Sequence, residues 1–139
     1  MNKKKSEFKI ADMTLIRSIF ETKGPYNPEL KDKSIVSIST DCMIDYTKGK
    51  KFILAFPMIE VKLIEKTTEE ANKGSWFLSV EIGYFIAMEI LSEEAKKKSI
   101  NSLKKMIIEI IWPYFRKEVR DYSVKAGYFP IDIDFFSSI

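Results

Sequence analysis

The residue types that carry most enzyme chemistry are nearly missing from this sequence. Its 139 residues include no His and a single Cys, Cys42. A Ser-His-Asp or Cys-His nucleophile, a Cys/His zinc site, a haem held by His and an internal disulfide are therefore excluded. Cys42 lies in a strand-like run, where a lone thiol is more often a packing residue than a nucleophile, so we assign it no role.

Carboxylates and tyrosines are the remaining groups able to act as acid and base. An enzyme would need Asp132, Asp134 or Glu81 paired in a cleft with a shifted pKa, and nothing in their spacing brings them together. We expect a protein that is not an enzyme and that has no cofactor and no metal.

The positive charge is modest and consists mainly of Lys. The sequence has 23 Lys and Arg against 20 Asp and Glu, a formal charge of +3, and its only arginines are Arg17, Arg116 and Arg120. Nucleic-acid sites depend on the planar Arg fork, whereas the lysines around Gly49 and at 96–105 fit solvated turn and helix faces. The dispersed glycines match neither a P-loop nor GxGxxG. We expect no nucleic acid or nucleotide as a partner.

Neither a secretory signal nor a membrane span is recognisable. The basic start at 1–5 is not followed by a continuous apolar stretch, and no run approaches about 18 apolar residues. We expect a cytoplasmic protein, without membrane insertion, in which residues 1–139 form one domain.

Apolar alternation predicts four strands, at 8–21, 34–47, 52–65 and 76–90. In the first strand the apolar set changes at 12–14, which predicts a bulge in a strand contacted on both faces. Pro57 has no amide hydrogen, so the third strand is expected at a sheet edge or bulged. The fourth strand has an unbroken apolar row on one face and is half apolar on the other, so we expect protein on both sides. A turn at 48–50 joins the second and third strands, and 21–33 is expected to be a crossing loop.

One long helix is predicted after the strands, which makes the fold class α+β. Ser92 and the two Glu residues that follow are a helix start, apolar residues recur at the helical period from Ile100 to Tyr122, and Gly127 ends the pattern. Pro113 predicts a kink or break.

The apolar surface exceeds what one chain can cover. One helix covers one face of a sheet, yet the fourth strand is apolar on both faces and the helix is apolar nearly all round from Met106 to Phe115. At about 25 cal/mol per Å², leaving such side chains in water forgoes several kcal/mol. Self-association is one remedy, and a pocket for an apolar ligand between sheet and helix is the alternative.

The segment 110–130 resembles the C-terminal helix motif of the SecB family of protein-export chaperones. Its matching residues are Pro113, Tyr114, Arg116, Glu118, Gly127, Phe129 and Pro130, with Lys117 inserted between Arg116 and Glu118. Gly83-Tyr-Phe85 is similar to the end of the family's fourth strand, and Ile19-Phe-Glu21 with Pro25 and Pro28 to its first strand and crossover. The resemblance implies a SecB-like four-stranded antiparallel sheet with one long helix packed on one face, and a homotetramer built as a dimer of dimers with helices layered between two sheets.

The function that this resemblance implies is an ATP-independent holdase for unfolded or non-native polypeptides, serving protein export or a dedicated client such as a toxin-antitoxin system. Flexible Met and flat aromatic side chains accept many sequences. On this basis the candidate client-binding residues are Tyr26, Leu30, Met43, Ile44, Tyr46, Tyr128, Phe129, Phe135 and Phe136. The candidate oligomer interface consists of Trp112, Tyr114, Phe115 and Tyr122.

The resemblance also assigns Glu21 to docking of the translocase motor SecA. SecB chains continue after the aromatic-Pro pair into a second helix that contributes to this contact, whereas here the segment 131–139 ends the sequence. This difference argues against transfer of clients to SecA.

Overall fold

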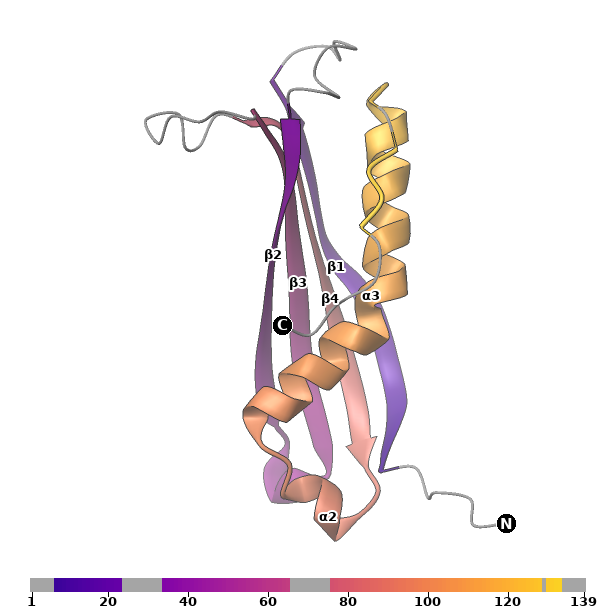
Figure 1. The fold of residues 1–139 in the computed structure, drawn as a ribbon. Coiled ribbons are helices and arrows are strands. Elements are labelled where there is room, and N and C mark those ends of the chain that lie inside the picture. The colour runs from indigo at the N-terminus through magenta and orange to yellow at the C-terminus, as the bar shows by residue number, and fades with distance from the viewer. Residues whose placement is uncertain (1–6, 24–33, 66–75, 129, 134–139) are drawn as a thin grey trace, which may run out of the picture.

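The computed structural model describes residues 7–23, 34–65, 76–128 and 130–133. Its strands are β1 (Phe8–Thr22), β2 (Ser34–Tyr46), β3 (Phe52–Glu65) and β4 (Trp76–Ile90), and its helical segments are η1 (Lys48–Lys50), α2 (Glu93–Lys96) and α3 (Ile100–Lys125). Figure 1 shows α3 lying across one face of a single sheet. The predicted α+β class and the four-stranded antiparallel sheet are confirmed.

The strand order is β1-β4-β3-β2, so β4 and β3 are central and β1 and β2 are the edges. The placement of β3 contradicts the edge or bulge predicted from Pro57. Its pairing with β4 pauses after Ala55 and resumes in the same register at Met58. The sheet therefore accommodates the missing amide by a short gap in the ladder, while Pro57 still lies opposite Cys42 on β2.

β1 is irregular and mostly exposed. Its register with β4 shifts between Ile10 and Asp12 and again between Leu15 and Arg17, so two irregularities flank the single one that was predicted at 12–14. The prediction that both faces of β1 are covered is wrong for a single chain, because β1 lies at the edge of the sheet and most of its residues are exposed.

The core lies between α3 and the facing sides of the two central strands. Ile53, Val61, Val80 and Ile82 on the strands are 0% exposed, and Phe115 of α3 is buried in the same core cluster. On the outer face, alternate residues of β4 from Phe77 to Glu89 remain mainly half-exposed. Within the described part of the chain, protein therefore covers only one side of β4, whereas both sides were predicted to be covered.

Two caps divide the predicted helix into two. The Ser92 hydroxyl accepts the Ala95 amide hydrogen at the start of α2, and the Ser99 hydroxyl accepts the Ser102 amide hydrogen at the start of α3. The sequence predicted one helix from Ser92, but a second N-cap restarts it. Gly127, with φ of 77°, ends α3 as predicted.

Figure 1 shows that α3 bends near its middle, which agrees with the kink predicted at Pro113. Its first half crosses the sheet, and its second half runs on the β1 side. In the second half, the ring of Tyr122 stacks on Phe20 with 5.9 Å between centroids, and Ser18 donates a hydrogen bond to the Tyr122 hydroxyl. Among the described helices, none combines the length and the apolar character that crossing a bilayer requires.

Candidate functional site

Exposed large apolar side chains concentrate on the two edge strands. These side chains have exposed fractions from 41% to 66%. They are Ile10, Leu15 and Ile16 on β1 and Ile35, Val36, Ile38 and Met43 on β2. Side chains of this size on β3 and β4 are buried or half-buried. Much of the surplus apolar surface predicted from the sequence therefore lies on the edge strands of the sheet.

The exposure along β2 follows from the path of α3. Val36, Ile38 and Cys42 belong to the same alternating set, which faces α3. Cys42 is 2% exposed because α3 crosses the strand there, whereas Val36 and Ile38 are 42% and 43% exposed. The half of β2 that precedes the crossing is left without a cover in the described structure (Figure 1).

The backbone edge of β2 is partly closed by its own side chains. The Asp41 carboxylate accepts the amide hydrogen of Cys42 at 2.8 Å, and the Asp45 carboxylate accepts that of Tyr46 at 2.8 Å. These amides would otherwise be open to a further strand, so each aspartate blocks one position of the edge.

A shallow hollow of about 210 Å³ lies where α3 crosses β2. It is lined by Thr40, Asp41, Cys42, Lys104, Lys105 and Ile108. Neither lysine is paired with a carboxylate in the part of the chain that the structure describes. Burial raises the pKa of the Cys42 thiol to about 11, although the nearby Lys104 opposes this shift. The thiol is therefore neutral at physiological pH.

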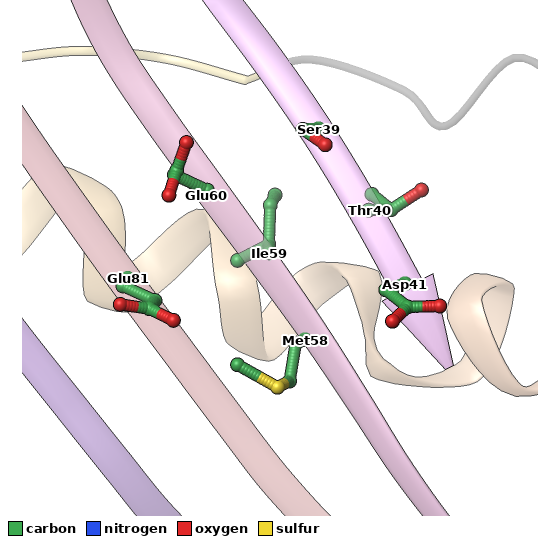
Figure 2. Close-up of a pocket in the computed structure, with 7 residues that line it drawn as sticks. All are labelled: Ser39, Thr40, Asp41, Met58, Ile59, Glu60 and Glu81. Carbon is green, nitrogen blue, oxygen red and sulfur yellow. The ribbon is translucent and has the colours of Figure 1, made fainter. Parts of the chain in front are cut away.

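A second hollow, of about 170 Å³, lies on the face of the sheet turned away from α3 (Figure 2). Its lining residues are Ser39, Thr40, Asp41, Met58, Ile59, Glu60 and Glu81. Glu81 forms two contacts with Arg17, at 3.0 and 3.2 Å, and Glu60 lies 3.4 Å from the Lys62 ammonium. The described residues contain no group of three possible metal ligands.

The segment after α3 folds back along the helix. Arg116 donates two hydrogen bonds to the Asp132 carboxylate, at 2.7 and 3.1 Å, and Ile131 and Ile133 are 1% and 2% exposed. At the far end of the segment, the Tyr128 hydroxyl donates to the Phe77 carbonyl at 3.4 Å. We call residues 128–133 the C-terminal strap, although the placement of residue 129 is not described.

This ion pair also bears on the acid and base residues considered from the sequence. The Arg116 hydrogen bond holds the pKa of Asp132 below its ordinary value. Asp132 lies on the helix side, Glu81 lies on the opposite face of the sheet, and Asp134 lies outside the described residues. The acid-base pair that an enzyme would need is therefore not formed by Asp132 and Glu81.

The four predicted client-binding residues that the structure describes do not lie on one surface. Met43 faces away from α3, whereas Ile44 and Tyr46 face towards it, and Tyr128 is 5% exposed at the opposite end of the sheet from Tyr46. The other predicted positions, Tyr26, Leu30, Phe129, Phe135 and Phe136, lie outside the described residues.

The predicted interface residues also separate into two groups. Trp112 and Phe115 are 9% and 0% exposed, because both pack inside their own chain. Phe115 therefore has no area to offer a second copy, which corrects that part of the prediction. Tyr114 is 45% exposed and Tyr122 is half-buried against β1, so part of each side chain is accessible to a second copy.

Sequence reasoning missed the aliphatic residues Ile35, Val36 and Ile38. Alternation placed Val36 and Ile38 on the apolar face of the strand, which predicts burial. The signal that could have found them is the length of β2, because one crossing helix is too narrow to cover a 13-residue strand. The predicted docking residue Glu21 is exposed near the end of β1.

Comparison with known proteins confirms the predicted fold. The structure is similar to that of the Mycobacterium tuberculosis SecB-like chaperone Rv1957 in complex with a ChAD peptide from the Rv1956 HigA1 antitoxin. The TM-score is 0.74 at 11% identity, covering 96% of this chain and 93% of that one. A protein of unknown function from Streptococcus agalactiae gives a TM-score of 0.48 at 8% identity, with 93% and 98% of the two chains covered. No family model and no curated protein match the sequence.

Proposed function

We propose that this chain is an ATP-independent chaperone that holds unfolded or non-native polypeptides, with residues 1–139 acting as one SecB-like domain. The observation that carries the proposal is the exposure of Ile35, Val36 and Ile38 on an edge strand. An exposed apolar edge is a hazard for a protein with no use for it, since it pairs with other extended chains. A holdase uses the same property to bind its clients.

The physical basis of such binding requires no catalytic group. Backbone hydrogen bonds along an edge strand form with any client sequence. Aliphatic side chains beside them favour the binding of apolar clients. Asp132 and Glu81 pair with Arg116 and Arg17 on opposite sides of the sheet, which is compatible with this mode of binding. The described hollows also open at the surface, so the alternative of an apolar ligand enclosed between sheet and helix gains no support from them.

The structural similarity to Rv1957 supports a chaperone for a dedicated client, in preference to one for general protein export. That protein was solved with a peptide from an antitoxin, and its fold matches 96% of this chain. We propose an antitoxin-like or similarly dedicated client in preference to general export. If export is the role, Glu21 is the position that we propose for contact with a motor such as SecA.

We further propose that copies of this chain associate through the exposed side of α3 into a homotetramer. Ile100, Tyr114 and Val124 are 42%, 45% and 52% exposed on this helix. Exposed apolar groups on a helix are typical of helix-to-helix contacts. Tyr114 and Val124 belong to the half of α3 after Pro113, which runs on the β1 side of the sheet (Figure 1), so contact there leaves the β2 edge open to clients.

Suppression of aggregation tests the proposed function. Insulin is reduced so that its B chain aggregates, and light scattering is followed with and without this protein. We expect suppression by the natural sequence and its loss in Val36→Asp/Ile38→Asp, because charges replace the apolar rim. Leu91→Asp is the control, since Leu91 is 47% exposed just after β4, at the opposite end of the sheet from Val36 and Ile38. The proposal fails if the natural sequence leaves the scattering unchanged at several molar excesses.

A further inference from the structure

The open edge of β2 has a limited extent. β2 pairs with β3 in one uninterrupted register from Ser34 to Tyr46, so successive amides point alternately towards β3 and away from it. The amides of Cys42 and Tyr46 point away, because each donates to an aspartate side chain. By the same alternation, the amides of Val36, Ile38 and Thr40 also lie on the open edge.

The two halves of this edge differ in their backbone groups. In the second half, Asp41 and Asp45 occupy the amides of Cys42 and Tyr46, which leaves Ile44 as a single outward amide between two closed ones. An added strand needs a run of alternate amides, and such a run exists only at Val36, Ile38 and Thr40. The exposed aliphatic side chains Ile35, Val36 and Ile38 lie in that same half.

The chemistry of the partner follows from what borders the open half. At Thr40 the strand reaches the hollow that contains Lys104 and Lys105, neither of which pairs with a carboxylate in the described structure. Asp41 lines the same hollow, but its carboxylate accepts the Cys42 amide hydrogen. A chain leaving the edge at this point meets two ammonium groups that form no ion pair with the residues described in the structure, which favours an acidic residue there.

We propose that the client adds as a short strand to residues 34–40 of β2, with an apolar extended segment on the open edge and an acidic residue beside Lys104 and Lys105. This inference rests on the proposed holdase function and specifies its site. Asp41 and Asp45 set the end of the client strand, since they close the edge amides beyond Thr40.

A peptide series tests the charge preference. Fluorescein-labelled peptides share a central run of Val, Ile and Thr and carry two Glu, two Lys or two Ser residues at one end. In fluorescence anisotropy we expect the Glu peptide to bind about fivefold more tightly than the Lys peptide, because each exposed charge pair contributes modestly. Lys104→Glu/Lys105→Glu should reverse this order. Equal affinity of the three peptides for the natural sequence overturns the acidic preference.

A second pair of variants tests the edge itself. Ser37→Asp/Ser39→Asp places an aspartate before Ile38 and Thr40, as Asp41 stands before Cys42, and should weaken binding about tenfold by closing two amides. Ser37→Glu/Ser39→Glu carries the same charge on a longer side chain and should bind nearly as the natural sequence does. Equal weakening by both variants contradicts the edge site.

Amide hydrogen exchange locates the bound peptide. We expect the amides of Val36, Ile38 and Thr40 to gain protection and those of Cys42 and Tyr46 to stay unchanged. Binding with protection elsewhere overturns this site and leaves the holdase function standing, whereas failure of both peptide binding and aggregation suppression removes the holdase function as well. A fall in mass on sedimentation of the aspartate variant, with unchanged peptide binding, would show that the edge holds a second copy instead.

Discussion

Cys42 shows how position, rather than residue type, decides the chemistry of a thiol. Burial raises the pKa of its thiol from 9.0 to about 11, with the Asp41 charge adding to the shift and Lys104 opposing it. Because the raised pKa favours the neutral form, its contribution to stability is present below pH 9 and is lost as the pH rises through about 11. The lone cysteine therefore packs, as its strand-like surroundings predicted.

We expect the native Cys42 thiol to resist iodoacetamide at pH 8, where almost none of it is thiolate, and to react readily in guanidinium chloride. Mass spectrometry at timed intervals measures the modified fraction. Rapid modification of the folded protein at pH 8 would contradict the packing role. Bound client peptide provides a further comparison, since the site proposed above at residues 34–40 ends two residues before Cys42.

Phe115 and Tyr114 are neighbours with opposite environments, and they make a matched pair of substitutions. Phe115 is 0% exposed and packs against Tyr84 and Trp112, so Phe115→Ala should lower the free energy of unfolding by about 3–5 kcal/mol. Tyr114 is 45% exposed and its ring makes an edge contact with Tyr84 at 6.2 Å between centroids, so Tyr114→Ala should lower the free energy of unfolding by only about 0.5–1.5 kcal/mol. Urea denaturation at low protein concentration measures both, and similar losses would contradict the orientation of α3.

The C-terminal strap is held to α3 by an ion pair between Arg116 and Asp132. Arg116 and Asp132 form two hydrogen bonds, and the pKa of Asp132 is lowered from 3.8 mainly by this contact. Because the pKa of Asp132 is lowered in the folded protein, the stabilisation by the Arg116–Asp132 ion pair is fully present above pH 3.8. It is lost as the pH falls through the lowered pKa. The burial of Ile131 and Ile133 depends on the same placement of the chain.

We expect Arg116→Ala to loosen the strap at neutral pH, with faster amide hydrogen exchange at Ile131, Asp132 and Ile133. Arg120→Ala is the matched control, because Arg120 acts on Asp132 only through longer-range attraction. Unchanged exchange in Arg116→Ala would show that apolar burial alone holds the strap. Exchange at pH values above and below 3.8 in the natural sequence tests the same contact without a mutation.

The bounds of the strands and helices were more predictable from this sequence than their positions relative to one another. Alternation gave the bounds of β3 and β4, and the turn at Gly49 and the end at Gly127 were found because both need a positive φ. The central position of β3 was missed, since a proline can sit inside a sheet where the ladder has a gap. The break between α2 and α3 was missed because Ser99 lies in a polar stretch where no apolar period marks the restart.

The site was less predictable, for a physical reason. Alternation states which side chains share a face, but exposure depends on how far a crossing helix reaches over that face. Val36 and Cys42 therefore received the same prediction and have opposite environments. The sequence alone does not indicate that Asp41 and Asp45 close amides of an edge, because this role requires β2 to be an edge strand.

At the scale of the whole molecule, the sequence predicted more apolar surface than one copy can cover, and the structure distributes that surface over three places. These are the rim of β1, the open half of β2 and the exposed side of α3. Under the proposals above, clients and second copies need not compete, because Tyr114 and Val124 lie in the second half of α3, whereas Lys104 and Lys105 in its first half border the β2 edge. Self-association through α3 and client binding on β2 should then respond to different substitutions.

Tyr114→Lys tests this separation. A charge in the middle of the exposed side of α3 should dissociate the assembly, because an unpaired ammonium buried in an interface is strongly unfavourable. We expect sedimentation velocity to give an oligomer for the natural sequence and for the control Leu91→Lys, whose side chain is 47% exposed just after the end of β4. Tyr114→Lys should sediment as a smaller species and still bind the Glu-flanked peptide. A monomeric natural sequence would contradict the proposed assembly, and joint loss of assembly and peptide binding would show that the two surfaces are one.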